Sequence, residues 1–167
     1  MILEKFLKIH IKHQIENGAQ IIQIFDSWAG LLNEKDLQNY IYKPTLNLVQ
    51  YVKSLNIPVI CFPRNIKNYK DYTNIIKPDV ISIDYNVTAK EIEKNVKIPV
   101  QGNLDPSLLF LPWENLESEW LKLWRRVEQS TIGPSKWICG LGHGVLPKTP
   151  EENVRKSVNL IHQKMTY

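Results

Sequence analysis

The sequence lacks any apolar run of the roughly 18 residues that a membrane-spanning helix needs. Residues 1–13 alternate Leu, Phe and Ile with Lys and Glu, so they also lack the unbroken apolar block of a secretory signal peptide. Internal repeats, linkers and low-complexity tracts are absent too. We therefore expect a cytoplasmic protein with no membrane partner, folded as a single domain over residues 1–167.

Cysteine is scarce, and no nucleophile motif surrounds any serine. The two cysteines, Cys61 and Cys139, each lie in an apolar run of strand length, so we expect buried free thiols. A Gly-x-Ser-x-Gly elbow is missing, which argues against acyl-enzyme chemistry.

The 21 basic and 17 acidic residues give a net charge of +4. Because the lysines are spread along the chain, nucleic acid is not an expected partner, whereas a mild positive field suits an anionic small substrate.

Apolar runs of strand length alternate along the chain with segments of helical periodicity. We expect strands at 21–25, 59–62, 80–83, 100–101 and 137–139. We expect helices at 2–16, from Asn33 to about Leu55, at 69–76, 88–96, 113–127 and from Thr149 to about Met165. Pro44 should interrupt and restart the second helix. Asn33, Thr88 and Thr149 are the expected N-caps, with Glu91 completing a capping box.

This alternation predicts an α/β fold with a parallel sheet covered by helices. Five strands do not close an eight-stranded barrel. On pattern alone the chain is therefore best described as a complete five-stranded doubly wound domain of the flavodoxin type.

Polar groups and glycines follow three of the expected strands directly. The segments are Phe25-Asp26-Ser27-Trp28-Ala29-Gly30, Gln101-Gly102-Asn103-Leu104-Asp105-Pro106 and Gly140-Leu141-Gly142-His143-Gly144-Val145-Leu146-Pro147. Ligands bind at the carboxyl ends of parallel strands. The glycines on both sides of His143 would let its backbone and ring approach a ligand closely. Asp105, before Pro106, is also an ideal N-cap, and we expect a structural role for it.

Together these motifs resemble the second half of the uroporphyrinogen decarboxylase family, from about Glu16 to His162. The resemblance implies the C-terminal five β/α units of a TIM-type (β/α)8 barrel in place of the doubly wound domain. It also implies a carboxy-lyase of haem biosynthesis, which decarboxylates the four acetate side chains of uroporphyrinogen III to give coproporphyrinogen III. The family needs no metal and no organic cofactor, its substrate is a tetrapyrrole, and it is typically a homodimer.

The resemblance assigns roles to particular residues. Ser27 and His143 match substrate-binding positions, and both side chains can donate a hydrogen bond to a carboxylate. Asp26, Arg64, Asp84 and Asn103 match strand-end positions that could support the site. After Arg64, bacterial members often have a glycine where this chain has Asn65, but asparagine tolerates a positive φ nearly as well.

Motifs of the family's first half do not occur in these 167 residues. They are an Arg-Gln-Ala-Gly-Arg segment, a substrate-contacting tyrosine, and an aspartate after Phe-Ser that stabilises the substrate's positive charge. We therefore assign no catalytic residue to this chain, expect a separate N-terminal half as partner, and expect no activity from the chain alone.

Two other interpretations remain open at this stage. The chain could be an inactive gene remnant or a binding module. It could also resemble the zinc-dependent, cobalamin-linked methyltransferases of the same superfamily, because Cys61 falls where their first cysteine ligand lies. However, Val59 occupies the histidine position and His143 the place of the second cysteine, so we expect no metal site.

Overall fold

Five short strands lie in the sheet in the same order as in the chain, β1-β2-β3-β4-β5. The computed structural model describes residues 2–165. The strands are β1 (Ile22–Asp26), β2 (Val59–Pro63), β3 (Val80–Ser82), β4 (Val100–Gln101) and β5 (Trp137–Ile138). The pairs β1–β2, β2–β3 and β4–β5 are parallel. A doubly wound sheet would reverse its strand order at a switch point. Since no reversal occurs, the doubly wound alternative is wrong, and the fold is that of consecutive β/α units of a TIM-type barrel.

Two compact units make up the chain, Met1–Ile81 and Ser82–Tyr167, and their boundary falls within β3. The expectation of one domain over residues 1–167 stays a prediction. Within residues 2–165, no helix has the length and apolar character to cross a bilayer.

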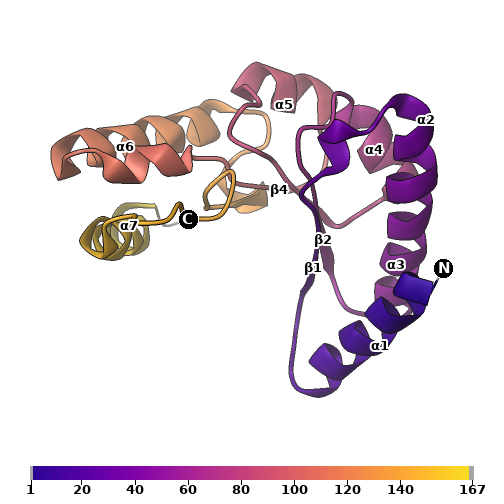
Figure 1. The fold of residues 1–167 in the computed structure, drawn as a ribbon. Helices are drawn as coiled ribbons and strands as arrows, with labels where there is room; N and C mark the ends of the chain where they lie inside the picture. The colour runs from indigo at the N-terminus through magenta and orange to yellow at the C-terminus, as the bar shows by residue number, and fades with distance from the viewer. Residues whose placement is uncertain (1, 166–167) are drawn as a thin grey trace. The chain divides into compact units, whose positions relative to one another are not determined.

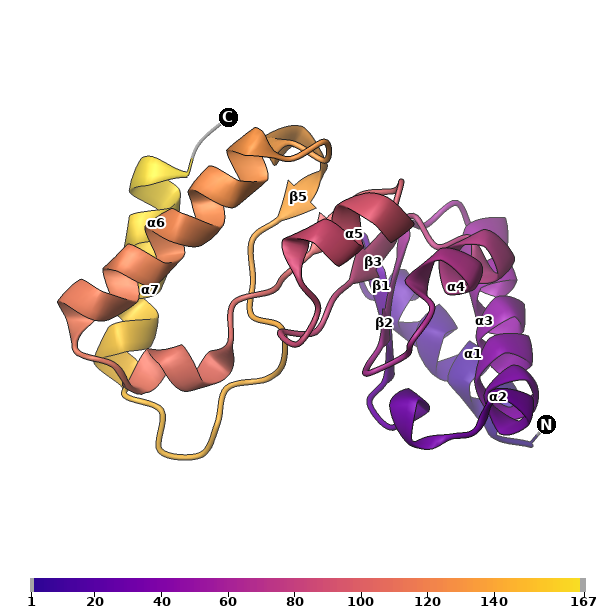
Figure 2. The same cartoon turned by 90° about the horizontal axis from the view of Figure 1, so that it is seen from above.

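In the first unit the helices form a layer on one side of β1 and β2 (Figures 1 and 2). They are α1 (Ile2–Glu16), α2 (Glu34–Asp36), η2 (Leu37–Tyr42), α3 (Lys43–Ser54) and α4 (Tyr69–Ile76), whereas the short η1 (Ala29–Leu31) lies in the turn after β1. Val52 of α3, Val59 of β2 and Ile76 of α4 are completely buried. The core of this unit therefore lies between the strands and their helices.

The expected break at Pro44 does not occur, because the chain stays helical from Glu34 to Ser54. Residues Leu37–Tyr42 form a π-helical turn, in which the N–H of Lys43 donates to the carbonyl of Gln38 five residues earlier. Proline has no N–H to donate and its ring crowds the carbonyl four residues before it. The wider turn accommodates that crowding without ending the helix.

In the second unit the helices begin largely where the sequence predicts. They are α5 (Ala89–Asn95), η3 (Pro106–Phe110), α6 (Trp113–Gln129), η4 (Pro134–Lys136) and α7 (Glu151–Lys164). The capping box of Thr88 and Glu91 is confirmed at the start of α5. The N-cap predicted at Thr149 is wrong. Its hydroxyl donates to the carbonyl of Leu146 at 2.6 Å, and Pro150 takes the N-cap position of α7.

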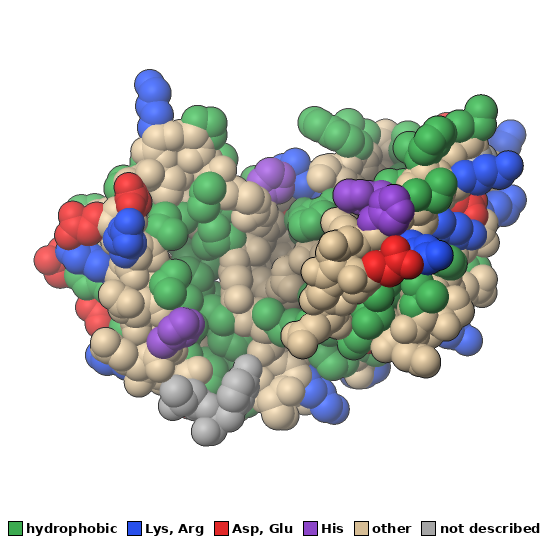
Figure 3. All heavy atoms as spheres, turned by 90° about the horizontal axis from the view of Figure 1, so that it is seen from below, with side chains coloured by type: hydrophobic (Ala, Val, Ile, Leu, Met, Phe, Trp, Pro, Cys, Tyr) green, Lys and Arg blue, Asp and Glu red, His purple; other side chains and the backbone are tan. Residues whose placement is uncertain are grey.

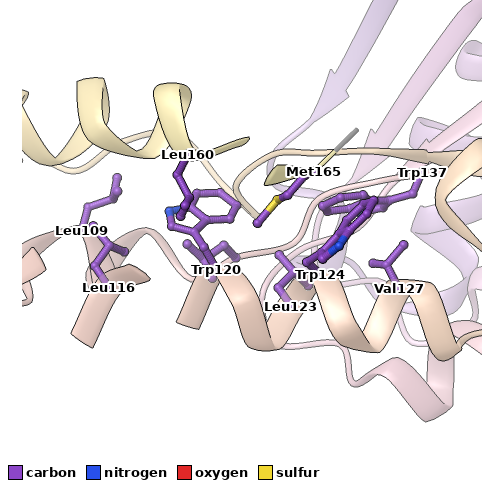
Figure 4. Close-up of a cluster of buried hydrophobic side chains, with 10 residues drawn as sticks. Leu109, Leu116, Trp120, Leu123, Trp124, Val127, Trp137, Leu160 and Met165 are labelled. Carbon is purple, nitrogen blue, oxygen red and sulfur yellow. The ribbon is translucent and has the colours of Figure 1, made fainter. Parts of the chain in front are cut away.

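A tryptophan-rich cluster forms the core of the second unit (Figure 4). One face of α6 contributes Trp120 and Trp124, which pack with Trp137 of β5 and Leu160 of α7. The indole Nε1 of Trp120 donates to the hydroxyl of Ser157 at 2.8 Å, so α6 and α7 are joined by a buried polar contact as well as by apolar packing.

The loop after β5 packs against the segment after β3 through Gly142. A Cβ added at Gly142 would lie 2.3 Å from the backbone nitrogen of Tyr85, whereas one added at Gly144 would meet nothing within 4 Å. One of the two glycines beside His143 is therefore needed for contact between loops of the protein itself.

We predict that Gly142→Ala lowers the free energy of unfolding by about 1–3 kcal/mol, because the methyl group forces two backbone segments apart. Gly144→Ala, two residues away, is the matched control and should change stability by less than about 0.5 kcal/mol. Urea denaturation of both variants measures the difference. Equal stabilities would contradict the packing role of Gly142.

Candidate functional site

Asp26, Ser27 and Arg64 lie at one edge of the sheet in the first unit. Asp26 ends β1 and pairs in register with Pro63, the last residue of β2. Beyond that pair, the backbone N–H of Arg64 donates to the carbonyl of Asp26 at 3.2 Å. The carbonyl of Arg64 in turn accepts from the N–H of Gly30 at 2.9 Å. The loops after β1 and β2 are thus joined at the carboxyl ends of their strands.

The side chain of Asp26 points to α3. Its Oδ2 accepts a hydrogen bond from the hydroxyl of Thr45 at 3.0 Å. Burial raises the pKa of Asp26, and the bond from Thr45 partly offsets that rise. Sequence reasoning missed Thr45, which lies 19 residues away. The carboxyl group of Asp26 thus contacts Thr45 of α3. A role of Asp26 in supporting a bound ligand stays a prediction.

One polar atom of Arg64 has no hydrogen-bond partner among the described residues. Arg64 is half-buried, and its Nε is buried with no hydrogen-bond partner in that part of the chain. A buried donor of this kind is costly unless another group bonds to it. Ser27 is also half-buried, in the turn that follows β1.

The residue after Arg64 adopts the backbone conformation that the sequence suggested. Asn65 has φ of 59°, in the left-handed region that asparagine tolerates. Its carbonyl oxygen lies 2.3 Å from where a Cβ of Gly30 would stand. Any side chain at position 30 would therefore collide with Asn65, and the glycine allows the loop after β1 to contact the backbone of the loop after β2.

Cys61, in the middle of β2, is a buried free thiol, as expected, whereas the free thiol of Cys139 is only half-buried, so the expected burial is wrong there. Burial raises its pKa to about 12, although contact with Tyr72 of α4 lowers it somewhat. Zinc is bound by the thiolate, so a metal ion at Cys61 would have to displace this proton. Among residues 2–165 no group of three or more His, Cys, Asp or Glu side chains could hold a metal ion.

In the second unit, Asn103 links the segments that follow β3 and β4. Its Nδ2 donates to the carbonyls of Asp84 and Val87, both at 3.0 Å. Asp84 is completely buried, and its Oδ1 accepts from the N–H of Asn86 at 2.9 Å. These contacts fix the turn after β3. Any contact of Asp84 or Asn103 with a ligand stays a prediction.

His143 lies beyond the carboxyl end of β5. Beyond β4 and β5 the parallel pairing continues through a bridge between Leu104 and Leu141, and the N–H of Gly142 donates to the carbonyl of Leu104 at 2.8 Å. His143 is half-buried directly after this bridge. Asp105 accepts from the N–H of Ser107 at 2.8 Å, which confirms its structural role as the N-cap of η3.

The sheet order defines a β/α-barrel protein, a fold in which ligands bind at the carboxyl ends of the strands. More specifically, the chain belongs to the uroporphyrinogen decarboxylase family, whose model, described as uroporphyrinogen decarboxylase (URO-D), matches residues 1–164. The expected family is thereby confirmed.

Curated proteins similar to this chain are named uroporphyrinogen decarboxylase, like the family model. The chain is 42% identical over 156 residues to uroporphyrinogen decarboxylase of Wolbachia pipientis wMel, covering 92% of this chain and 45% of that protein. It is 38% identical to the enzyme of Staphylococcus epidermidis ATCC 12228, covering 92% and 43%. It is 39% identical to that of Orientia tsutsugamushi Ikeda, covering 96% and 47%. The chain thus spans a little under half the length of these relatives.

Burial of Asp26 should make the stability of the protein depend on pH. Because its pKa is raised on folding, the folded state binds the proton more tightly than the unfolded chain. This contribution to stability is present at low pH and is lost as pH rises from the ordinary carboxyl value, about 3.9, through the raised pKa of the folded state.

We predict that Asp26→Asn, which keeps an acceptor for Thr45, unfolds at higher urea concentration than the native chain at pH 7. The advantage should shrink towards pH 3, where the native carboxyl group is itself neutral. Thr45→Val is the companion variant. It removes the bond that favours the carboxylate, so it should steepen the pH dependence. An Asp26→Asn protein less stable than the native chain at pH 7 would count against this account.

Proposed function

We propose that this chain supplies part of the substrate site of uroporphyrinogen decarboxylase, and that the site is complete only with the remainder of the family's barrel. The reaction would remove four acetate carboxyl groups from uroporphyrinogen III as carbon dioxide and give coproporphyrinogen III. The observation that carries the proposal is the family match over residues 1–164.

The chemistry of the strand-end residues suits an anionic substrate. Ser27 would donate its hydroxyl hydrogen to a substrate carboxylate, and His143 would donate from its imidazole to another. The buried Nε of Arg64, which lacks a partner among the described residues, would gain one from a carboxylate oxygen. The net charge of +4 would favour the approach of such a substrate.

Binding groups alone do not account for decarboxylation. When carbon dioxide leaves, the electron pair of the broken C–C bond must be accepted, which most enzymes achieve with a cofactor. In this family a protonated pyrrole of the substrate is expected to accept the pair, and an aspartate to stabilise that cation. Neither that aspartate nor the arginine-rich segment has a counterpart among these 167 residues, so they would come from the remainder of the barrel.

Co-expression tests the proposal. We expect no decarboxylase activity from this chain alone, and turnover when it is produced together with the part of the Wolbachia pipientis wMel enzyme that it does not match. Chromatographic assay of coproporphyrinogen, after oxidation to the porphyrin, measures the product. A stable co-complex without turnover would favour an inactive remnant or a binding module.

A second experiment tests the role of His143. In the co-expressed enzyme, His143→Ala should weaken equilibrium binding of a uroporphyrin about tenfold or more, the usual scale for losing a charge-assisted hydrogen bond. Its urea denaturation should change little. His162→Ala, an exposed histidine on α7, is the control and should leave binding unaltered. Unchanged binding with a large loss of stability would make His143 a structural residue.

A further inference from the structure

One buried hydrogen bond between side chains holds the carboxyl end of β1 to α3. Asp26 is the last residue of β1, and its Oδ2 accepts from the hydroxyl of Thr45 at 3.0 Å. Thr45 lies in the first turn of α3 and is only 3% exposed. A buried hydroxyl is costly to leave unpaired. The bond therefore fixes this turn of α3 and the end of β1 against each other.

The backbone of Asp26 is held as well, by the loop after β2. Its carbonyl accepts from the N–H of Arg64 at 3.2 Å, and the carbonyl of Arg64 accepts from the N–H of Gly30 at 2.9 Å. Asp26 is thus bound on two sides, through its side chain to α3 and through its backbone to the loop after β2. The turn after β1 starts from this doubly held residue.

The partner of Asp26 differs in kind from those of the surface carboxylates. Figure 3 shows acidic and basic side chains side by side at the surface of the part of the molecule that carries α1. In α1, for example, Nζ of Lys12 lies 3.6 Å from Oε1 of Glu16, and both side chains are exposed. Exposed ion pairs of this kind fix their side chains only weakly. Asp26 is half-buried and bonds to a neutral hydroxyl, so its direction is better defined.

The π-helical turn before α3 determines which residue of that helix faces Asp26. In η2 the N–H of Lys43 donates to the carbonyl of Gln38, five residues earlier. A π-turn holds one more residue than an α-turn, so the residues after it are rotated by about 100° relative to an uninterrupted α-helix. Thr45 comes two residues later. Without the π-turn, a different side chain would face β1 at this point.

Ser27 follows Asp26 directly, in the turn after β1. Consecutive Cα atoms are held about 3.8 Å apart by the peptide bond between them, so a shift of Asp26 moves Ser27 as well. Displacing a binding group by about 1 Å is enough to weaken its interaction with a ligand severely. The contacts that fix Asp26 therefore also limit where the hydroxyl group of Ser27 lies.

We propose that Thr45 and Asp26 are positioning residues: their hydrogen bond holds the end of β1 where the hydroxyl of Ser27 meets a carboxylate of the tetrapyrrole. This rests on the proposed function, in which Ser27 donates to that carboxylate. Neither Thr45 nor Asp26 contacts the substrate in this arrangement, because the side chain of Asp26 is turned towards α3. Loss of the bond should therefore lower the affinity for substrate through Ser27.

Amide hydrogen exchange on this chain tests the anchoring without substrate. Thr45→Val keeps the shape of the side chain and removes the hydroxyl. It should speed exchange of the Gly30 and Arg64 amides about threefold or more, because the residue that holds them is less fixed. Thr45→Ser keeps the hydroxyl and should stay within about twofold of the native rates. Thr73→Val is the matched control. Thr73 is also buried, but its hydroxyl bonds to the carbonyl of Tyr69 within α4 at 2.9 Å, so both amides should exchange as in the native chain.

Binding of a uroporphyrin to the co-expressed enzyme tests whether the anchoring acts on Ser27. Thr45→Val should weaken equilibrium binding about threefold to tenfold, the scale of one hydrogen bond. Thr45→Ser and Thr73→Val should each change it less than about twofold. In an enzyme that already carries Ser27→Ala, adding Thr45→Val should weaken binding less than about twofold further, since the group that Thr45 positions is absent.

Unchanged exchange of the Gly30 and Arg64 amides in Thr45→Val would overturn the proposal. So would a loss of binding that is equally large with and without Ser27→Ala, because Thr45 would then act independently of the serine. Weak binding by Ser27→Ala together with native binding by Thr45→Val would refute the positioning role and leave the proposed function standing. Faster exchange in Thr45→Val, with a co-expressed protein that binds no uroporphyrin, would support the anchoring and refute the proposed function.

Discussion

Parallel pairing of β1 with β2 forces the chain to return from the end of one strand to the start of the next, and α3 makes that return. Two consequences follow from this geometry. The carboxyl ends of β1 and β2 point to one edge, so Asp26 and Arg64, which are far apart in sequence, come together there. The helices meanwhile collect in a layer on the strands, where Val52 and Ile76 are completely buried. The β1–α3–β2 connection therefore both aligns the carboxyl ends of the two strands and brings the helices onto the strands to form the core.

Local chemistry explains which elements could be predicted from the sequence. The capping box of Thr88 and Glu91 and the helix that begins at Trp113 are encoded by residues a few positions apart, and both were predicted correctly. Pro44 was misjudged because the rule for proline assumes an α-helix on both sides, whereas a π-turn widens the backbone before it. Thr149 was misjudged because its hydroxyl bonds to Leu146 in the preceding loop. Strand order is not contained in hydrophobic periodicity, and only the family resemblance separated a barrel from a doubly wound sheet.

For the candidate site, the sequence predicted positions better than it predicted contacts. Ser27, Arg64 and His143 do follow strands, since an apolar run and the polar residue after it are adjacent in the chain. Thr45, the partner of Asp26, comes from the following helix and carries no local signal. Gly142 was read as making room for a ligand, but its contact with Tyr85 arises from segments nearly sixty residues apart.

The buried tryptophans of this protein all lie in the second unit, which decides what tryptophan fluorescence can detect. Trp120, Trp124 and Trp137 are buried together in the second unit, and Trp113 packs beside them. Trp28, the one tryptophan of the first unit, is 72% exposed and so is already close to the solvent environment of an unfolded chain. Tryptophan fluorescence therefore reports mainly on Ser82–Tyr167. Structural changes around β1 and α1 would alter tryptophan fluorescence very little. Detecting them requires a fluorophore attached to the first unit.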